Sequence, residues 1–157
     1  MNRPLYIFDI DGTLAIINHR VSILEDKDNP NRWRDFYAAC DRDEPNKPVI
    51  FIMNNLMLSG ADVWLFSGRS EEVRDKTVAW IAEHTAFMSF NLNYEHLLTM
   101  RPAMDYTPDD VLKESWLDNM LEDDKKRLVA VFDDRDRVVN MWRRRGITCL
   151  QVAPGDF

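Results

Sequence analysis

The sequence predicts an α/β fold in which a central parallel sheet carries helices on both faces. Short apolar runs alternate with amphipathic stretches along the chain, as in successive βαβ units. No internal repeat or low-complexity segment interrupts this alternation. Several of the apolar runs are followed directly by acidic or hydroxyl residues. These polar residues therefore fall at the carboxyl ends of the predicted strands, where open parallel sheets bind their ligands.

The length and composition fit a single globular domain over residues 1–157. The chain is 45% hydrophobic and 30% charged, which is enough apolar material for one core with a small insertion. No apolar run reaches the length of a membrane span, and residues 1–4 lead straight into a strand, so neither a membrane partner nor a signal peptide is expected. The two distant cysteines, Cys40 and Cys149, predict reduced thiols in a cytoplasmic protein.

The net charge of −7 limits the kinds of partner that the chain can hold. It argues against strong non-specific binding to nucleic-acid phosphates, because such binding needs an excess of basic residues. A local basic site for one nucleotide or one strand end remains compatible with it.

The first strand is expected over residues 4–10, because Leu5 to Phe8 form a short apolar run. Residues 14–45 are polar and irregular, with a loop over 26–31, and are expected to form a small insertion. Within this insertion, Trp33, Phe36 and Tyr37 have the spacing of a short amphipathic helix.

The next elements follow from apolar periodicity and from helix-ending glycines. A helix is expected over residues 48–59, ended by Gly60, and a core strand over 62–66. A second helix should run from Ser70 to about residue 86, with early acids that suit the helix dipole. Residues 94–99 are expected to form a strand.

The C-terminal third completes the alternation. Residues 107–121 are expected to form a helix, residues 128–132 a strand, and residues 135–145 a helix ended by Gly146. The last strand is expected over 147–152. With the earlier strands, these elements predict a parallel sheet covered on both faces.

The stretch Phe8-Asp9-Ile10-Asp11-Gly12-Thr13-Leu14 places two carboxylates at the end of the first strand. Two close carboxylates repel each other, so a cation, a shared proton or both must offset them. The pair suits a reaction in which one aspartate attacks and the other moves a proton. A strand that simply ends in an Asp-Gly turn is the structural alternative.

Three further polar groups follow predicted strands or begin helices. Ser67-Gly68-Arg69 combines a hydroxyl, a flexible glycine and a helix start, which together suit an anion. Lys113 adds a positive charge one turn into its helix. Asp133-Asp134 is a second carboxylate pair, and two such pairs together call for a divalent cation, for which hard oxygen ligands favour Mg²⁺. Each group taken alone also has a purely structural explanation. Ser67-Gly68-Arg69 fits a helix start, Lys113 a solvated lysine, and Asp133-Asp134 an N-cap pair.

Together these motifs resemble those of the haloacid dehalogenase superfamily of phosphotransferases. The resemblance implies a Rossmann-like core and Mg²⁺-dependent phosphoryl transfer. Asp9 would be the nucleophile that forms an aspartyl-phosphate, and Asp11 would protonate the leaving oxygen and then activate water. The implied phosphate ligands are Thr13 and Ser67 with Gly68, and Lys113 would neutralise charge. The implied Mg²⁺ ligands are Asp9, the backbone carbonyl of Asp11, Asp133 and Asp134.

A narrower resemblance involves three segments: residues 11–15 with Arg20, residues 109–114, and residues 132–157. These are similar to the phosphatase domain of bacteriophage polynucleotide kinase/3′-phosphatases. The resemblance implies that Arg20 and Arg69 hold the substrate phosphate or its surroundings and that Asp109 orients Lys113. It also implies that residues 14–45 form a small cap over the site. No Gly-rich loop ending in Lys-Ser/Thr occurs, so no kinase domain is expected in this chain.

These resemblances favour a phosphatase that removes the 3′-phosphate from a polynucleotide end or a nucleotide, in the cytoplasm or in the host cytoplasm for a phage protein. The alternatives are a 5′-nucleotidase or other small-molecule phosphatase, and a non-catalytic nucleotide-binding module. The intact Asp9 and Asp11 pair argues against the non-catalytic alternative. The cap aromatics fit either a small hydrophobic core or a surface that stacks on a base. The three histidines share no ligand spacing and are expected to be non-catalytic.

Overall fold

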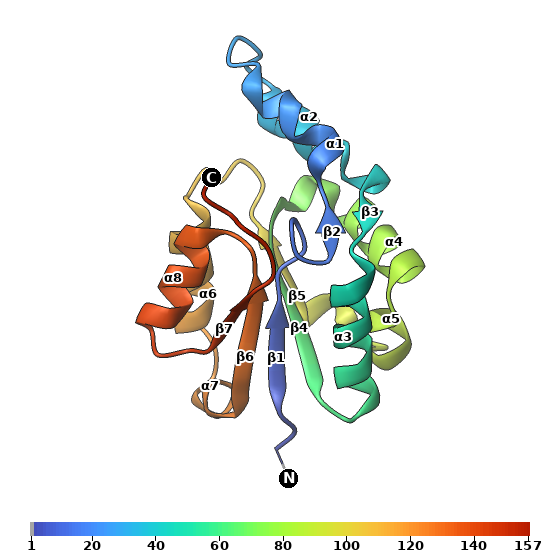
Figure 1. Cartoon of the computed structure of the whole chain (residues 1–157), viewed down its shortest axis with the longest axis vertical. Coiled ribbons are helices and arrows are strands. Elements are labelled where there is room, and N and C mark those ends of the chain that lie inside the picture. Colours follow the sequence, from blue (N-terminus) through green and yellow to red (C-terminus); the bar gives the residue numbers. More distant parts are fainter. Residues whose placement is uncertain (1) are drawn as a thin grey trace.

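The computed structural model describes residues 2–157 and confirms the α/β fold class (Figure 1). Five strands form one sheet in the order β5-β4-β1-β6-β7, and every neighbouring pair is parallel. The strands are β1 (Leu5–Phe8), β4 (Asp62–Ser70), β5 (Leu98–Arg101), β6 (Leu128–Asp133) and β7 (Cys149–Gln151). Because all five run in the same direction, their carboxyl ends lie at one edge of the sheet.

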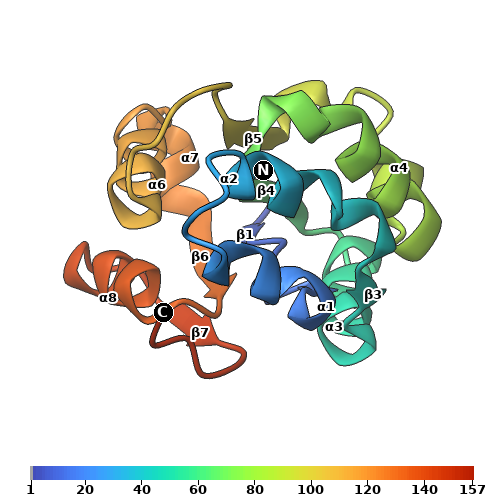
Figure 2. The ribbon, with the colours of Figure 1, turned by 90° about the horizontal axis from the view of Figure 1, so that it is seen from above.

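Helices cover both faces of the sheet, as predicted (Figures 1 and 2). The helices on one face are α3 (Lys47–Leu58), α4 (Arg74–His84) and α5 (Phe87–Phe90), and those on the other are α6 (Asp109–Asp118), α7 (Glu122–Arg127) and α8 (Asp136–Arg144). Alternate residues of β1 point to opposite faces. Leu5 and Ile7 pack in the core beneath α6 and α8, and Phe8 packs in the core beneath α3 and α4.

The chain between β1 and α3 rises above the carboxyl edge of the sheet (Figure 1). Its base is a small antiparallel hairpin of β2 (Ala15–Ile16) and β3 (Glu44–Pro45). Between these strands lie α1 (Asn18–Val21), η1 (Ser22–Glu25), α2 (Arg32–Ala38) and η2 (Cys40–Arg42). Seen from above, α2 lies over the end of the sheet (Figure 2). We call residues 14–45 the cap segment.

Some element boundaries differ from the expectation. β4 continues to Ser70, and its register with β5 shifts between Ser67 and Ser70, so Gly68 and Arg69 lie in an irregular strand end rather than at a helix start. A 3₁₀ turn, η3 (Glu71–Val73), then precedes α4. The strand expected over 94–99 is displaced, because a fourth 3₁₀ turn, η4 (Tyr94–His96), precedes β5.

Three short helices, α1, α5 and α7, were not expected from the sequence. The segment forming α7 has no apolar periodicity, since all six of its residues are charged. Acidic residues occupy its first turn and basic residues its last, an order that suits the helix dipole.

Cys40 and Cys149 are buried and unpaired. Among residues 2–157, no helix has the length and apolar character that crossing a bilayer requires.

Candidate active site

Three buried carboxylates meet at the carboxyl ends of two neighbouring strands. Asp9 directly follows β1, Asp133 is the last residue of β6, and Asp134 comes next. β1 and β6 pair in parallel up to Phe8 and Phe132, and the Asp9 backbone N–H donates to the Phe132 carbonyl at 2.9 Å. One oxygen from each carboxylate lies within 4.8 Å of the others. The sheet register therefore concentrates three acidic groups at one point.

A single buried lysine lies among these carboxylates. Lys113, on α6, is 2% exposed, and its Nζ donates to Asp9 Oδ1 and Asp133 Oδ2, both at 2.8 Å. Burial alone would lower the pKa of Lys113, but Asp133 and Asp9 outweigh it and raise that pKa. Thr13, which is fully buried, donates its hydroxyl hydrogen to Asp9 Oδ2 at 3.1 Å. Both oxygens of Asp9 are therefore held in place.

The charge in this cluster is not balanced by the chain itself. Burial first and the neighbouring Asp133 second raise the pKa of Asp9. The same two causes raise the pKa of Asp134 to about 7. The cluster holds three carboxylates but only one ammonium group, that of Lys113. It therefore has an excess of negative charge and offers carboxylate oxygens as ligands. This donor set fits Mg²⁺.

Asp11 lies outside the three-carboxylate cluster and between two arginines. Its Oδ1 accepts from Arg20 Nη2 and from Arg69 Nε, both at 2.7 Å, and both guanidinium groups are fully buried. Burial raises the pKa of Asp11, but the charges of Arg69 and Arg20 outweigh burial, so that pKa lies below its usual value. Arg20 and Arg69, predicted as phosphate ligands, thus contact a carboxylate of the predicted catalytic pair.

A further buried carboxylate, Asp43, completes the arginine network and was missed from the sequence. It accepts from Arg20 Nε at 2.8 Å, from Arg20 Nη2 at 2.7 Å and from Arg69 Nη2 at 2.8 Å. His19 Nε2 lies 2.7 Å from the same carboxylate, and Trp80 donates to the Asp43 backbone carbonyl. Asp43 lies among polar cap residues with no motif around it, so no sequence signal marks it.

Two glycines of the predicted motifs lie where a side chain has no room. Gly12 has a φ of +82°, and a Cβ there would lie 2.0 Å from Asp134 Oδ2. A Cβ at Gly68 would lie 2.5 Å from Asp109 Oδ1. Ser67, fully buried, accepts from the Arg69 backbone N–H at 3.2 Å, which stabilises the irregular end of β4. These glycines let the loops approach the acidic side chains closely.

Asp109, which the resemblance implied would orient Lys113, has no hydrogen bond to that residue among the described side chains. The Asp109 carboxylate pairs instead with Arg101 and, at 3.1 Å, with Arg135. Its negative charge still contributes to the raised pKa of Lys113, after those of Asp133 and Asp9. Arg101, also missed from the sequence, is 7% exposed and donates through Nε to the Gly68 carbonyl at 2.9 Å. Arg101 therefore links the end of β4 to the start of α6.

The three cap aromatics all lie on α2 but have different surroundings. Phe36 is buried, and the Arg20 guanidinium carbon lies 4.3 Å from its ring centroid. Burial raises the pKa of Tyr37 to about 12, opposed by the nearby Arg101. Trp33 remains 41% exposed. Phe36 thus packs against an arginine of the site, and Trp33 packs against Phe36 and Tyr37 while remaining partly exposed.

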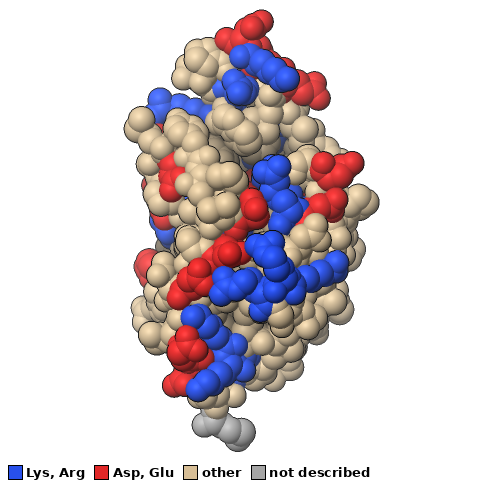
Figure 3. All heavy atoms as spheres, turned by 90° about the vertical axis from the view of Figure 1, so that its left-hand side faces the viewer, with Lys and Arg blue, Asp and Glu red and all other residues tan. Residues whose placement is uncertain are grey.

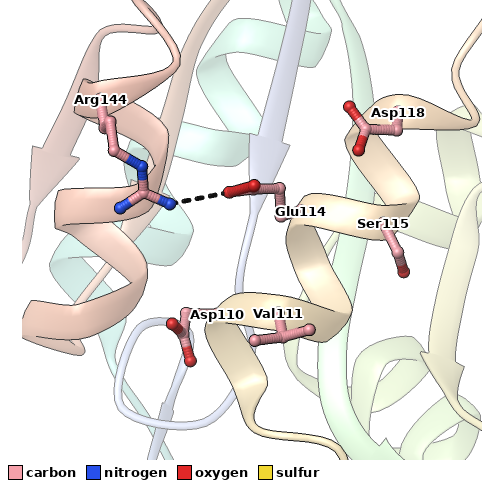
Figure 4. Close-up of a pocket in the computed structure, with 6 residues that line it drawn as sticks. All are labelled: Asp110, Val111, Glu114, Ser115, Asp118 and Arg144. Atoms are coloured by element: carbon pink, nitrogen blue, oxygen red, sulfur yellow. Dashed lines mark hydrogen bonds and ion pairs between the residues drawn. The ribbon is translucent and has the colours of Figure 1, made fainter.

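The outer surface of α6 and α8 is separate from this cluster. A groove there is lined by Asp110, Val111, Glu114, Ser115, Asp118 and Arg144 (Figure 4). Arg144 pairs with Glu114 at 2.9 Å and Arg145 with Asp118 at 2.7 Å. Basic and acidic side chains are interspersed over this side of the molecule (Figure 3). The arginine run at the end of α8 therefore neutralises acidic neighbours on α6.

Comparison with known proteins identifies relatives over the whole described chain. The family model of the "Polynucleotide kinase PNKP phosphatase domain" matches residues 3–157. A protein of Autographa californica nuclear polyhedrosis virus, named as a bifunctional polynucleotide kinase/RNA ligase, is 31% identical over 136 residues, which are 86% of this chain and 17% of that protein.

Solved structures agree with this match. A chain from the "Structure of the Pnkp1/Rnl/Hen1 RNA repair complex" is 30% identical, with a TM-score of 0.75, and the match covers 100% of this chain and 46% of the other. The class C acid phosphatase of Bacillus anthracis is 14% identical, with a TM-score of 0.65 over 98% of this chain and 67% of its own, and shares the fold.

The chain spans less than half the length of the viral protein and of the RNA repair complex chain that it matches. The family match nevertheless extends over both acidic clusters, the cap segment and the C-terminal strand and helix. The sequence motifs, the parallel sheet and the family model all indicate the same family. The chain belongs to the family of polynucleotide kinase PNKP phosphatase domains and is a phosphomonoesterase of the haloacid dehalogenase type.

Proposed function

We propose that this chain is an Mg²⁺-dependent phosphatase that removes the 3′-phosphate from a nucleic-acid end or a nucleotide through an aspartyl-phosphate intermediate. The observation that carries this proposal is the arrangement around Asp9. Its two oxygens are held separately by Thr13 and Lys113 at the carboxyl end of β1. A buried carboxylate fixed in this way is suited to attack phosphorus, because its orientation is set before the substrate arrives.

Asp11 supplies the proton transfers on either side of the intermediate. In the first step it donates a proton to the leaving sugar oxygen as Asp9 forms its bond to phosphorus. In the second step the Asp11 carboxylate takes a proton from the water that attacks the aspartyl-phosphate. Arg20 and Arg69 favour the ionised form needed in the second step. An incoming phosphate brings negative charge close to Asp11 and favours the protonated form needed in the first.

Asp9, Asp133 and Asp134 are the side chains that would hold Mg²⁺. When bound, the ion neutralises negative charge on the phosphoryl group and on the carboxylates around it. Lys113 adds a fixed positive charge at the same point, since it bridges Asp9 and Asp133. This combination lets an anionic nucleophile approach an anionic substrate.

The choice of a nucleic-acid end as substrate is supported by the relatives, and the choice of its 3′-phosphate by the resemblance of residues 109–114 and 132–157 to 3′-phosphatase domains. The family model carries the name of a polynucleotide kinase, and the solved relative belongs to an RNA repair complex. The acidic chain, with a net charge of −7, favours a small footprint on the substrate. Lengthening an oligonucleotide beyond its terminal residues should therefore add little affinity, and the salt dependence should be shallow.

The test compares matched oligonucleotides that carry a phosphate at the 3′ or the 5′ end, with Mg²⁺ and with a chelator. The expected result is a higher kcat/KM for the 3′-phosphate and no turnover in excess chelator. An Asp9→Asn protein, purified identically, controls for contaminating phosphatases. A higher kcat/KM for the 5′-phosphate would instead support a nucleotidase, and turnover in chelator would overturn the role of the carboxylate cluster.

A further inference from the structure

His19 contacts the arginine network of the site but has no role in the chemistry described above. It lies on α1, in the part of the cap segment that rises from β2 (Figure 1). Its Nε2 is 2.7 Å from Asp43 Oδ1. The His19 side chain is 36% exposed, whereas Asp43 and the two arginines that it binds are fully buried. His19 therefore lies at the outer end of a buried polar network.

The partners of Asp43 decide which atom of this contact carries the hydrogen. A carboxylate offers about four lone-pair positions on its two oxygens. Arg20 fills two of them through Nε and Nη2, and Arg69 fills a third through Nη2. Because two guanidinium groups donate to it, the carboxylate acts as an acceptor, and His19 Nε2 donates the hydrogen of the fourth bond. His19 therefore completes the set of donors around Asp43.

One nitrogen of Arg20 connects Asp43 to the predicted catalytic pair. Arg20 Nη2 donates to Asp43 Oδ2 and to Asp11 Oδ1, both at 2.7 Å. A guanidinium group is a planar fork whose donors do not move independently. A rotation of the Asp43 carboxylate therefore turns the whole Arg20 fork and moves a donor that fixes Asp11.

The two guanidinium groups are poorly placed to compensate for such a rotation. Each also donates through Nη1 to another group of the protein, Arg20 to the Phe36 carbonyl at 3.3 Å and Arg69 to the Thr77 hydroxyl oxygen at 3.2 Å. Both groups are fully buried, so a bond that is lost is not readily replaced by one to water. The orientation of the carboxylate that they share is therefore transmitted to Asp11.

We propose that His19 is a positioning residue for proton transfer by Asp11. Its hydrogen bond fixes the rotation of the Asp43 carboxylate, which holds the two arginines where they present Asp11 to the leaving oxygen. As the bond from Asp9 to phosphorus forms and the bond from phosphorus to the sugar oxygen breaks, the proton of Asp11 moves to that oxygen. His19 acts through Asp43 and takes no part in the transfer itself. This inference rests on the proposed function and adds a residue of the cap segment to it.

The experiment compares a 3′-phosphorylated oligonucleotide with an aryl phosphate, whose leaving group needs the proton of Asp11 far less. The measured quantity is the ratio of the two kcat/KM values. In His19→Ala this ratio should fall about 10-fold, a part of the roughly 10²- to 10⁴-fold that a general acid contributes. His19→Leu fills the space without a donor and should show the same loss. His19→Gln should recover most of the ratio, because its amide N–H can donate to Asp43.

A change elsewhere on the surface separates this effect from the general loss of an imidazole. His96→Ala removes an exposed imidazole from η4, and it should keep the wild-type ratio. Melting curves of all variants establish which are folded at the temperature of the assay. If His19→Ala does not fold, the comparison of His19→Leu with His19→Gln decides the question.

The two proposals fail in different ways. If wild-type protein cleaves the oligonucleotide and the folded His19→Ala or His19→Leu protein keeps the wild-type ratio, the positioning role is refuted and the proposed function stands. An equal loss on both substrates refutes it too, because the cap segment would then be disturbed as a whole. A loss in His19→Gln as large as that in His19→Leu refutes the hydrogen bond as the cause. If wild-type protein cleaves the aryl phosphate but not a 3′-phosphorylated end, the proposed function itself fails.

Discussion

Asp43 offers the sharpest test of how the site is held together. The change Asp43→Asn keeps the size of the side chain and removes its negative charge. The side chain is fully buried and accepts three hydrogen bonds from Arg20 and Arg69. After the change, two buried guanidinium groups would face Asp11 as their one remaining carboxylate partner.

The size of the effect follows from the burial. Removing one partner of a buried ion pair costs about 3–5 kcal/mol, because the other charge is left in a poorly solvated place. For a chain of this length each kcal/mol lowers the melting temperature by about 2–4 °C. Asp43→Asn should therefore melt about 6–20 °C below the wild type. Asp41→Asn is the matched control, because its side chain is 49% exposed and its change should cost less than about 0.5 kcal/mol.

Activity provides a second readout below the melting temperature of the variant. Asp43 contacts Arg20 and Arg69 but no group that reacts, so it is a positioning residue for Asp11. A sugar leaving group needs the proton of Asp11, whereas an aryl leaving group needs it far less. The kcat/KM for a nucleoside 3′-phosphate, which reports the steps up to departure of the leaving group, should fall by about 100-fold or more, and that for an aryl phosphate by much less. Equal losses on both, or a melting temperature like that of Asp41→Asn, would refute this reasoning.

Three other outcomes are expected. Asp9→Asn should fold but lose about 10⁴-fold or more in kcat, as nucleophile removal does elsewhere, and near-wild-type turnover would exclude the covalent step. Mg²⁺ at about 100 times its Kd should stabilise the wild type by about 2.7 kcal/mol. In thermal denaturation, Asp134→Asn should show a smaller increase in stability on adding Mg²⁺, and an unchanged increase would remove Asp134 from the metal site. Gly12→Ala should abolish activity, since its Cβ would meet Asp134, whereas Gly60→Ala, also at positive φ but in open space, should only lose stability; kinetics and melting curves compare the two.

The sheet, the helices on its two faces and the meeting of the acidic motifs could be predicted from the order of residues along the chain. Alternation in β1 sends Leu5 and Ile7 to one core and Phe8 to the other, and such local patterns can be read directly from the chain. The motifs at Asp9 and at Asp133-Asp134 follow strands, and parallel strands bring their ends together by topology alone. The sequence could therefore predict that these carboxylates lie close together, and the structure adds that one oxygen from each lies within 4.8 Å of the others.

The pairing of each basic side chain with its acidic partner could not be predicted from the sequence and depends on the folded chain. Arg20 and Arg69, which were expected to hold the substrate phosphate or its surroundings, lie against Asp11 and Asp43. Asp109 pairs with Arg101 and Arg135. Most of these partners come from segments far apart in the chain, and no local pattern encodes their meeting. Buried charges must find partners wherever the packing places them, and that choice is made by the whole fold.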